Sequence, residues 1–323
     1  MRIYRLLIIV LVFSLLAMPG VASAQEAAQG KVEGQVINGT EGGGNVAGVE
    51  VTLISYNNDA IYETRTVTAD SDGRFLFEEV NPSHQHVVSA SYMDVHYYNP
   101  VMFEEGETIA YVEVGVCDLT ESNIAIMADL SHIILDVQED DIEITEMFWL
   151  VNNGDRTYKG TYGSLIFTLP EGAKNFKAPE SLMPDFELLD SNTLAYLVPF
   201  PPGERQIVFS YLLPKPESDE AEMHLELDFP VSSFSLMVGG KNIEIAASQL
   251  SPAEPVTTNT GKQFIHLRGE SLPPDTVLDV HLYGLSGSKG LSAVVLWVIA
   301  AIIIVCIVVY IFWRKKKVTS KNG

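Results

Sequence analysis

Short runs in which apolar and polar residues alternate recur along most of this chain. One such run places Val49, Val51 and Leu53 on a common side. Successive side chains of a β-strand point to opposite faces, so a period of two predicts strands that bury one face. Between residues 30 and 285 there is no long apolar period of 3.6 residues, which would indicate amphipathic helices. The pattern therefore restricts this region to an all-β fold.

Clusters of Gly, Asn and Asp separate the alternating runs. Gly and Asn tolerate positive φ, so a cluster such as Asn57-Asn58-Asp59 predicts a tight turn. Several short strands between turns are typical of β-sandwiches. We therefore expect two tandem β-sandwich domains, one at residues 25–119 and an immunoglobulin-like one at 120–285. The second has the strand number of an immunoglobulin-like sandwich without its cysteine pair.

The first residues predict an export signal. Two arginines precede a short apolar run, and a small-residue Ala-Ser-Ala motif ends at Ala24, directly before Gln25. A basic start, a short apolar core and an A-x-A-like end are typical of a signal peptide that is removed after export. We predict cleavage between Ala24 and Gln25 and assign residues 1–24 to the signal. A first transmembrane helix is the alternative.

The other end predicts a membrane anchor. Residues 291–313 carry no charge, and a helix of this length spans the roughly 30 Å of a bilayer's hydrocarbon core. A spacer at residues 286–290 precedes this predicted transmembrane helix, and a short basic tail at 314–323 follows it. Basic residues beside a span stay in the cytoplasm, so the preceding domains are expected outside the cell membrane. The residues of this topology anchor are Arg314, Lys315, Lys316 and Lys317.

Charge and cysteine content exclude several classes of protein. The formal net charge of −22 is unsuited to a phosphate backbone, so no nucleic-acid partner is expected. The chain has only two cysteines, which rules out a disulfide-rich scaffold. Cys306 lies within the predicted span, so Cys117 has no exported cysteine in its own chain to pair with. Cys117 is either a buried thiol or one half of an intermolecular bridge.

Three segments in the first half resemble a known family. They read GKVEGQVINGT from Gly30, VAGVEVTL from Val46 and TADSDGRF from Thr68, and Val80 follows. Over residues 30–117 they resemble the carboxypeptidase regulatory-like, transthyretin-like domain, as found in bacterial membrane-anchored proteins. The resemblance implies a small antiparallel β-sandwich, similar in shape to carbohydrate-binding folds. It implies no peptidase activity, because no zinc peptidase domain accompanies it.

Histidines offer a candidate metal site. His84 and His86 are two residues apart, so on a strand their side chains share a face. His96 follows after the next turns, with Met93 and Met102 nearby. Imidazole and thioether ligands suit copper. The alternative is a loop that enters a strand and carries ordinary exposed histidines, and no other cofactor is expected.

Two further patterns offer acidic oxygens to a cation. The tetrapeptide Asp-Ser-Asp-Gly that starts at Asp70 resembles the start of a calcium loop, but the later ligands are not at the expected spacing. A hairpin turn is therefore the preferred interpretation. His224, Glu226 and Asp228 would share one strand face, where they either help to bind a cation or form a solvated polar surface.

Tyr97 and Tyr98 form a candidate ligand platform. Sugar sites stack pyranose rings on exposed aromatic side chains beside acids and amides, and Asp94, Asn99 and Glu104 are close in sequence. The alternative places these aromatic rings in the core, because small sandwiches need large side chains there.

Motifs that would indicate catalysis are missing. The sequence contains no H-E-x-x-H, C-x-x-C, G-x-S-x-G, G-x-G-x-x-G or P-loop motif. We therefore predict a non-enzymatic protein-interaction or assembly module at the outer face of the cell membrane, whose partners are envelope or membrane proteins. The edges of its sheets can add a strand from a partner. A surface module that binds a glycan or a metal ion is the alternative.

Overall fold

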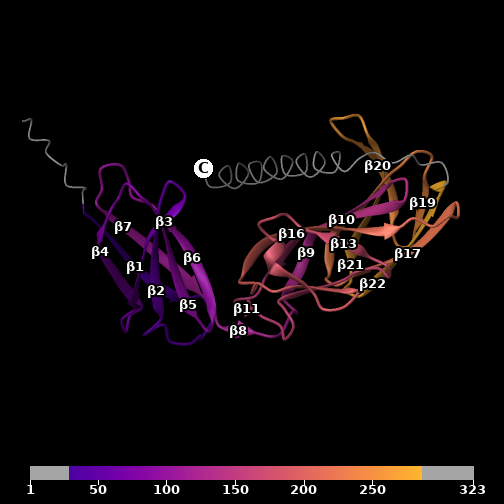
Figure 1. The fold of residues 1–323 in the computed structure, drawn as a ribbon. Helices are drawn as coiled ribbons and strands as arrows, with labels where there is room; N and C mark the ends of the chain where they lie inside the picture. The colour runs from indigo at the N-terminus through magenta and orange to yellow at the C-terminus, as the bar shows by residue number, and fades with distance from the viewer. Residues whose placement is uncertain (1–28, 286–323) are drawn as a thin grey trace, which may run out of the picture. The chain divides into compact units, whose positions relative to one another are not determined.

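The computed structural model describes residues 29–285, and nearly all regular structure in this range is β-strand. The only helical element among these residues is the short 3-10 turn Met183–Asp185. The chain divides into two compact units (Figure 1). Unit 1 contains residues 29–116 except the segment 39–44, and unit 2 contains that segment and residues 117–285. The expected all-β fold is confirmed.

Unit 1 contains a three-stranded sheet and a four-stranded sheet in its described part. The apolar residues of the alternating runs are buried, including Val36 and Phe77 in the smaller sheet and Leu53 and Val88 in the larger one. The strand orders are β4-β1-β7 and β3-β2-β5-β6. These strands are β1 (Gly30–Asn38), β2 (Glu50–Asn57), β3 (Ala60–Thr68), β4 (Arg74–Val80), β5 (Gln85–Tyr92), β6 (Val95–Val101) and β7 (Ile109–Val116).

The first and last strands of unit 1 are parallel neighbours. β1 pairs with β7 from Lys31↔Ile109 to Asn38↔Val116, whereas its pairing with β4 is antiparallel. The expectation of a purely antiparallel sandwich is therefore wrong for this sheet. Parallel neighbours need a long connection, and strands β2 to β6 provide it here.

Unit 2 is built on a seven-stranded sheet, counted over its described residues. β10 lies between β16 and β9 and is antiparallel to both, and β9 is parallel to β18. The order is β13-β16-β10-β9-β18-β21-β20. These strands are β9 (Ile126–Val137), β10 (Asp141–Asn152), β13 (Lys174–Lys177), β16 (Gly203–Pro214), β18 (Val231–Gly239), β20 (Ser251–Thr257) and β21 (Gln263–Leu272).

Three smaller sheets complete the described part of unit 2, in the orders β12-β15-β14, β17-β22-β19 and β11-β8. Strands β8 to β22 together exceed the seven to nine strands of an immunoglobulin sandwich. The excess comes from strands without regular alternation, which the pattern did not predict. The remaining strands are β8 (Leu119–Thr120), β11 (Thr157–Tyr158), β12 (Leu165–Thr168), β14 (Phe186–Leu188), β15 (Thr193–Tyr196), β17 (Glu220–Leu227), β19 (Glu244–Ala247) and β22 (Thr276–Tyr283).

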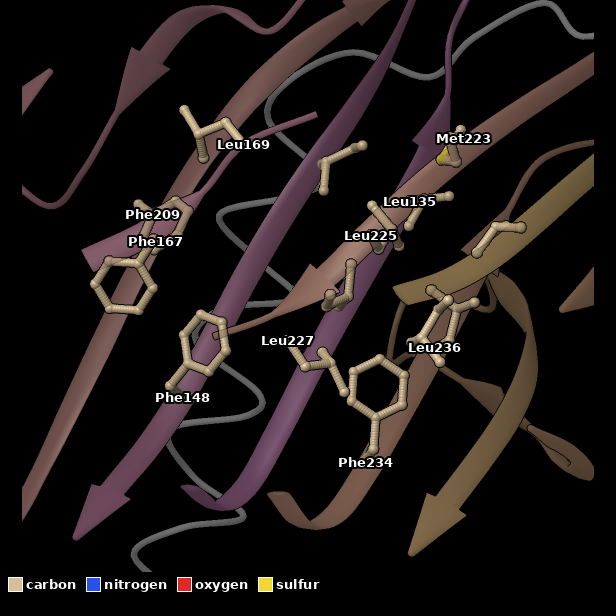
Figure 2. Close-up of a cluster of buried hydrophobic side chains, with 14 of the residues drawn as sticks. Leu135, Phe148, Phe167, Leu169, Phe209, Met223, Leu225, Leu227, Phe234 and Leu236 are labelled. Atoms are coloured by element: carbon tan, nitrogen blue, oxygen red, sulfur yellow. The ribbon is translucent and has the colours of Figure 1, made fainter. Parts of the chain in front are cut away.

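The main core of unit 2 joins one face of the large sheet to strands of the smaller sheets. Figure 2 shows Phe148, Phe167 and Phe209 gathered at one end of this core, with Leu225 and Leu227 farther along. The ring centroid of Phe209 lies 5.1 Å from that of Phe167 and 6.1 Å from that of Phe148. Such offset and edge-to-face contacts add to the stabilisation that burial provides.

The opposite face of the large sheet carries a second, smaller apolar cluster. Ile134, Met147, Met237 and Phe264 are buried there and pack with the partly buried Trp149. Neighbouring residues of a strand point to opposite faces, which is why Met147 and Phe148 belong to different clusters. Both faces of this sheet are therefore apolar in part.

Candidate functional site

The four-stranded sheet of unit 1 ends at β3, whose side chains are largely exposed. Among the described strands β3 pairs only with β2, so its other edge belongs to no ladder. Arg65 and Val67 are half-buried, and every other residue from Ala60 to Thr68 is exposed. The N–H and C=O groups along such an edge can pair with a strand of another chain. The outer edge of β3 is therefore our candidate site.

A tight turn determines where β3 begins. Asn58 and Asp59 have φ values of 49° and 64°, which suits the two central residues of a type I′ hairpin turn. Asn and Asp accept this left-handed conformation more readily than most residues. Ile, Tyr, Thr and Val then fill most of β3, and these residues favour extended backbone. The local sequence thus produces a hairpin that projects one strand to the sheet edge.

Charge on this edge is balanced. Glu63 and Arg65 are the charged residues of β3, and their side chains form an ion pair of 3.3 Å. Arg65 also donates a hydrogen bond of 2.6 Å to the backbone oxygen of Glu78 and lies over the ring of Phe77. The Arg65 side chain is therefore held against β4, and it leaves β3 without a projecting basic residue.

Three other sheet edges carry features that oppose strand addition. The short edge strand β13 has Lys174 and Lys177 at its ends, and β20 contains Pro252 and Pro255. On β6, Pro100 lacks an N–H, and a neighbouring asparagine amide donates to the backbone of β7. Lysine and proline are common means of blocking edge-to-edge pairing. β3 contains neither residue, so its edge remains open to a partner.

The start of β3 is also apolar and aromatic. Ile61 is 66% exposed and Tyr62 is 65% exposed. The Tyr62 ring lies edge-on to the ring of His84, with 4.7 Å between centroids. Exposed large apolar side chains beside an unpaired edge give a partner both backbone and side-chain contacts.

The three predicted metal-binding histidines have different environments. His86 is buried, and its two ring nitrogens lie 2.9 Å from Ser55 Oγ and 2.9 Å from the backbone oxygen of Asn81. Burial is the main cause that lowers the pKa of His86. His84 lies near it, with 6.3 Å between ring centroids, whereas His96 is exposed on β6 and pairs with Ser91. The structure therefore brings His84 and His86 together without His96.

No group of three His, Cys, Asp or Glu residues in the described range is arranged to hold a metal ion. The hydrogen bonds of His86 also occupy the nitrogens that a metal would need. The copper hypothesis thus gains no support from this geometry.

Tyr97 and Tyr98 do not form one surface. Tyr97 is buried, whereas Tyr98 is 59% exposed on the other face of β6. Adjacent strand residues point in opposite directions, which explains the difference. Tyr98 instead lies beside His96, with 6.2 Å between ring centroids. A glycan platform that uses both tyrosines is therefore not assembled here.

The residues of the two acidic sequence patterns lie in different environments. The Asp70 carboxylate accepts backbone hydrogen bonds of 2.8 Å from Asp72 and from Arg74, as expected for a turn. In unit 2, His224 is exposed and lies 2.7 Å from the Asp279 carboxylate. Asp228 is half-buried, and its carboxylate accepts hydrogen bonds from Thr168, so it does not share one solvated face with His224 and Glu226. β17 ends at Leu227, so Asp228 lies beyond the strand on which His224 and Glu226 share a face.

Unit 2 also contains buried acids that the sequence did not reveal as such. The Tyr211 hydroxyl donates a hydrogen bond of 2.6 Å to Glu146 Oε1 within the core. Burial raises the pKa of Glu146 to about 8, and the nearby Asp228 charge adds to the rise. Burial likewise raises the pKa of Asp228 to about 6. Glu146 therefore holds a proton at neutral pH, which makes the stability of unit 2 depend on pH.

The remaining predictions concern reactivity and location. Cys117 is half-buried, and burial followed by the charge of Asp155 raises the pKa of its thiol, so its reactive thiolate form is disfavoured. The signal-cleavage pair Ala24–Gln25 and the anchor at 314–317 lie outside the described residues. Between residues 29 and 285, no helix has the length and apolarity needed to cross a membrane.

The comparisons with known proteins leave the family open. No protein-family model and no curated protein matches the chain. Among solved structures the chain is similar to the full-length RrgB pilus protein from Streptococcus pneumoniae, with 10% identity and a TM-score of 0.21. The likeness covers 79% of this chain and 61% of that chain, which is less than two thirds of the pilus protein. At this TM-score it supports no argument about function.

β3 itself was missed by the alternation argument. An edge strand with both faces exposed has no apolar period, so its residues 60–68 show none. Two signals were present: the Asn-Asn-Asp turn and the β-branched residues that follow it. What the sequence could not show is that no neighbouring strand covers this edge.

Proposed function

We propose that this protein is a non-enzymatic interaction module, anchored in the cell membrane, that binds an extended segment of an envelope protein along β3. The observation that carries the proposal is the exposed outer edge of β3, in a four-stranded sheet whose other edge strand, β6, contains proline. Main-chain hydrogen bonds would supply affinity, and the side chains around Ile61 and Tyr62 would supply selectivity.

The chemistry of β3 defines the class of partner. Glu63 and Arg65 neutralise one another, so the edge itself selects no charge. Exposed Ile61, Tyr62 and Thr64 favour a partner segment that is β-branched or aromatic and free of proline. The acidic balance of the whole chain disfavours strongly acidic partners at long range. The expected partner is thus an extended, β-prone segment of neutral or basic charge.

The proposal also includes the membrane location of the protein and the fold families of its two units. Export through the signal at 1–24 and anchoring through 291–313 would hold both units at the outer face of the membrane. The resemblance at residues 30–117 supports a transthyretin-like assignment for unit 1, and an immunoglobulin-like relationship is proposed for unit 2. A tethered scaffold of this kind acts by positioning partners, which needs no catalytic groups.

Site-specific photocrosslinking in native membranes tests the proposal. A photoreactive residue in place of Thr64 is expected to capture a membrane or envelope protein through an extended segment. The same residue in place of Ile124, which is 91% exposed in unit 2, is the matched control and is expected to capture none of it. Equal capture at both positions, or no capture at Thr64, would contradict strand addition at β3.

Lysine substitutions provide a second test of the same edge. The pair Ile61→Lys and Thr64→Lys adds charges that an incoming strand would have to desolvate, so recovery of the partner should fall about tenfold or more. Thermal stability should change little, because both side chains are exposed. Ile124→Lys, the matched control, should leave recovery unchanged. Unchanged recovery from the double variant would exclude β3 as the binding edge.

A further inference from the structure

A lysine and an aspartate from distant parts of unit 2 meet in a buried position. Lys262 Nζ lies 2.6 Å from Asp136 Oδ1, and the two side chains are only 10% and 2% exposed. The second carboxylate oxygen of Asp136 has no hydrogen-bond partner among the described residues. By contrast, the ion pair between Lys174 and Asp141 on the same sheet is 46% and 24% exposed. Lys262 and Asp136 are thus an ion pair largely removed from water.

Local structure explains how Lys262 reaches this position. A turn precedes β21, in which the Thr258 N–H donates to the backbone oxygen of Lys262 and Gly261 has a φ of 80°. The Lys262 side chain then crosses β18 at Gly239, which pairs with Asp136 on one side and Phe264 on the other. A Cβ atom on Gly239 would lie 3.0 Å from Lys262 Cε and 2.7 Å from the Phe264 ring. Gly239 therefore leaves the space through which the amine passes.

A second carboxyl group faces the same pair. Glu143 on β10 lies directly opposite Asp136 on β9 in the sheet register, so the two side chains are neighbours on one face. Gln138 donates a hydrogen bond of 2.7 Å to Glu143 Oε2 and holds that carboxyl group in place. Burial raises the pKa of Glu143 and of Asp136, which favours their protonated, neutral forms. An amine and two carboxyl groups thus lie together on one face of the sheet.

We propose that Lys262 and Asp136 condense to an intramolecular amide, with Glu143 as the group that moves the protons. A proton passes from the Lys262 ammonium to the Asp136 carboxylate, the neutral Nζ amine then attacks Asp136 Cγ, and a new N–C bond forms. Glu143 takes a proton from the nitrogen and delivers one to the departing oxygen. The C–O bond of Asp136 then breaks and one water molecule leaves. Atoms and charges balance, because an amine and a carboxylic acid become an amide and water without an oxidant or an energy-rich co-reactant.

Three physical effects favour this reaction at this place. The reacting groups are already in contact, and such positioning is worth several powers of ten in effective concentration. Exclusion of water limits the reverse hydrolysis of the amide. It also strengthens the electrostatic interactions between the reacting groups and Glu143. Condensation also replaces two buried charges with one neutral group, which removes the desolvation cost of the ion pair. No amide is expected between Lys174 and Asp141, because water reaches that pair.

The bond would link β9 to the turn before β21, across a long stretch of chain. A crosslink that closes a long loop stabilises a protein mainly by restricting its unfolded state. In an exported protein with few cysteines, an amide would serve as a crosslink that reducing agents do not open. This inference is independent of partner binding at β3.

Mass spectrometry of the denatured full chain tests the proposal. The wild-type protein is expected to be lighter by one water molecule than its sequence requires, and tryptic digestion should yield a branched peptide that joins Lys262 to Asp136. Lys262→Arg and Glu143→Gln should each restore the full mass. Asp136→Asn should instead lose ammonia, because an amide group would then be the one displaced. Lys174→Arg is the matched control and should leave the loss of water unchanged.

Each outcome is decisive. A wild-type chain of full mass, with unmodified Lys262 in the digest, would establish a non-covalent ion pair and overturn the proposal. Loss of water that survives in Lys262→Arg would place the lost water elsewhere and also overturn it. If Glu143→Gln retains the branched peptide, Glu143 is not the proton carrier. Circular dichroism of each variant shows whether it is folded, and the conservative Lys262→Arg change keeps the charge that the fold contains.

Discussion

Truncation of Phe209 to alanine is expected to lower the free energy of unfolding of unit 2 by about 4 kcal/mol, the usual range for a buried phenylalanine. The side chain is 1% exposed and lies beside Phe167 at the aromatic end of the core in Figure 2. Its ring contacts those of Phe148, Phe167, Phe176, Phe186 and Tyr211. Removal of the ring leaves a cavity that these neighbours fill only in part.

Urea denaturation followed by tryptophan fluorescence measures this effect. Tyr162→Ala removes a ring that is 73% exposed and is the matched control, with an expected change within about 0.5 kcal/mol. Phe209→Leu should cost less than the alanine variant, and it provides a measurable value if Phe209→Ala does not fold. A loss below about 1 kcal/mol for Phe209→Ala would mean that the ring is not central to the core.

Replacement of Glu146 by glutamine is expected to stabilise unit 2, and the gain should grow with pH. The pKa of Glu146 is about 8 in the folded protein, against 4.5 for an ordinary glutamate. A carboxyl group with a raised pKa contributes stability that is present below pH 4.5 and is lost as the pH rises toward 8. The slope in this window is about 1.4 kcal/mol per pH unit, so the expected gain at pH 7 is about 3 kcal/mol.

Glutamine suits this position because its amide oxygen can still accept the hydrogen bond from Tyr211. The measurement is the free energy of unfolding of both proteins between pH 4.5 and 8.5. Glu226→Gln changes an exposed glutamate on β17 in the same way and is the matched control. Parallel curves for wild type and Glu146→Gln would show that Glu146 is ionised in the folded protein.

His132 changes the stability of unit 2 with pH in the opposite direction to the buried acids Glu146 and Asp228. Burial is the main cause that lowers the pKa of His132 to about 4. A histidine with a lowered pKa contributes stability above its ordinary value of 6.5, and that stability is lost as the pH falls toward 4. The core acids and His132 therefore act in opposite directions. The Glu146 comparison isolates the acid, because His132 is present in both proteins.

The open edge of β3 and the buried Lys262–Asp136 pair both follow from the order of strands in a sheet, one in unit 1 and the other in unit 2. The four-stranded sheet of unit 1 ends at β3, whose outer backbone groups are left for a partner. On β9 and β10 the sheet of unit 2 is continuous, and its register places Asp136 opposite Glu143. In the proposed interaction module, the proposed binding edge would belong to a scaffold whose other unit carries a covalent crosslink.

The sequence by itself determined the local features. The alternation at Phe75 and Phe77 predicted β4. Clusters of Gly, Asn and Asp predicted the turns of the hairpins. These features depend on residues that are close in the chain, so pattern and turn propensity suffice. The resemblance at residues 30–117 stays a prediction, as do the signal and the membrane anchor.

Only the tertiary structure decided which strands become neighbours. The parallel pairing of β1 with β7, the open edge of β3 and the meeting of Lys262 with Asp136 all join or separate residues far apart in the sequence. Glu146 likewise falls on the core face of β10, but its hydrogen-bond donor, Tyr211, comes from another strand. Strand pairing, side-chain burial and pKa depend on which segments pack together. The alternation of one strand shows only which of its own side chains share a face.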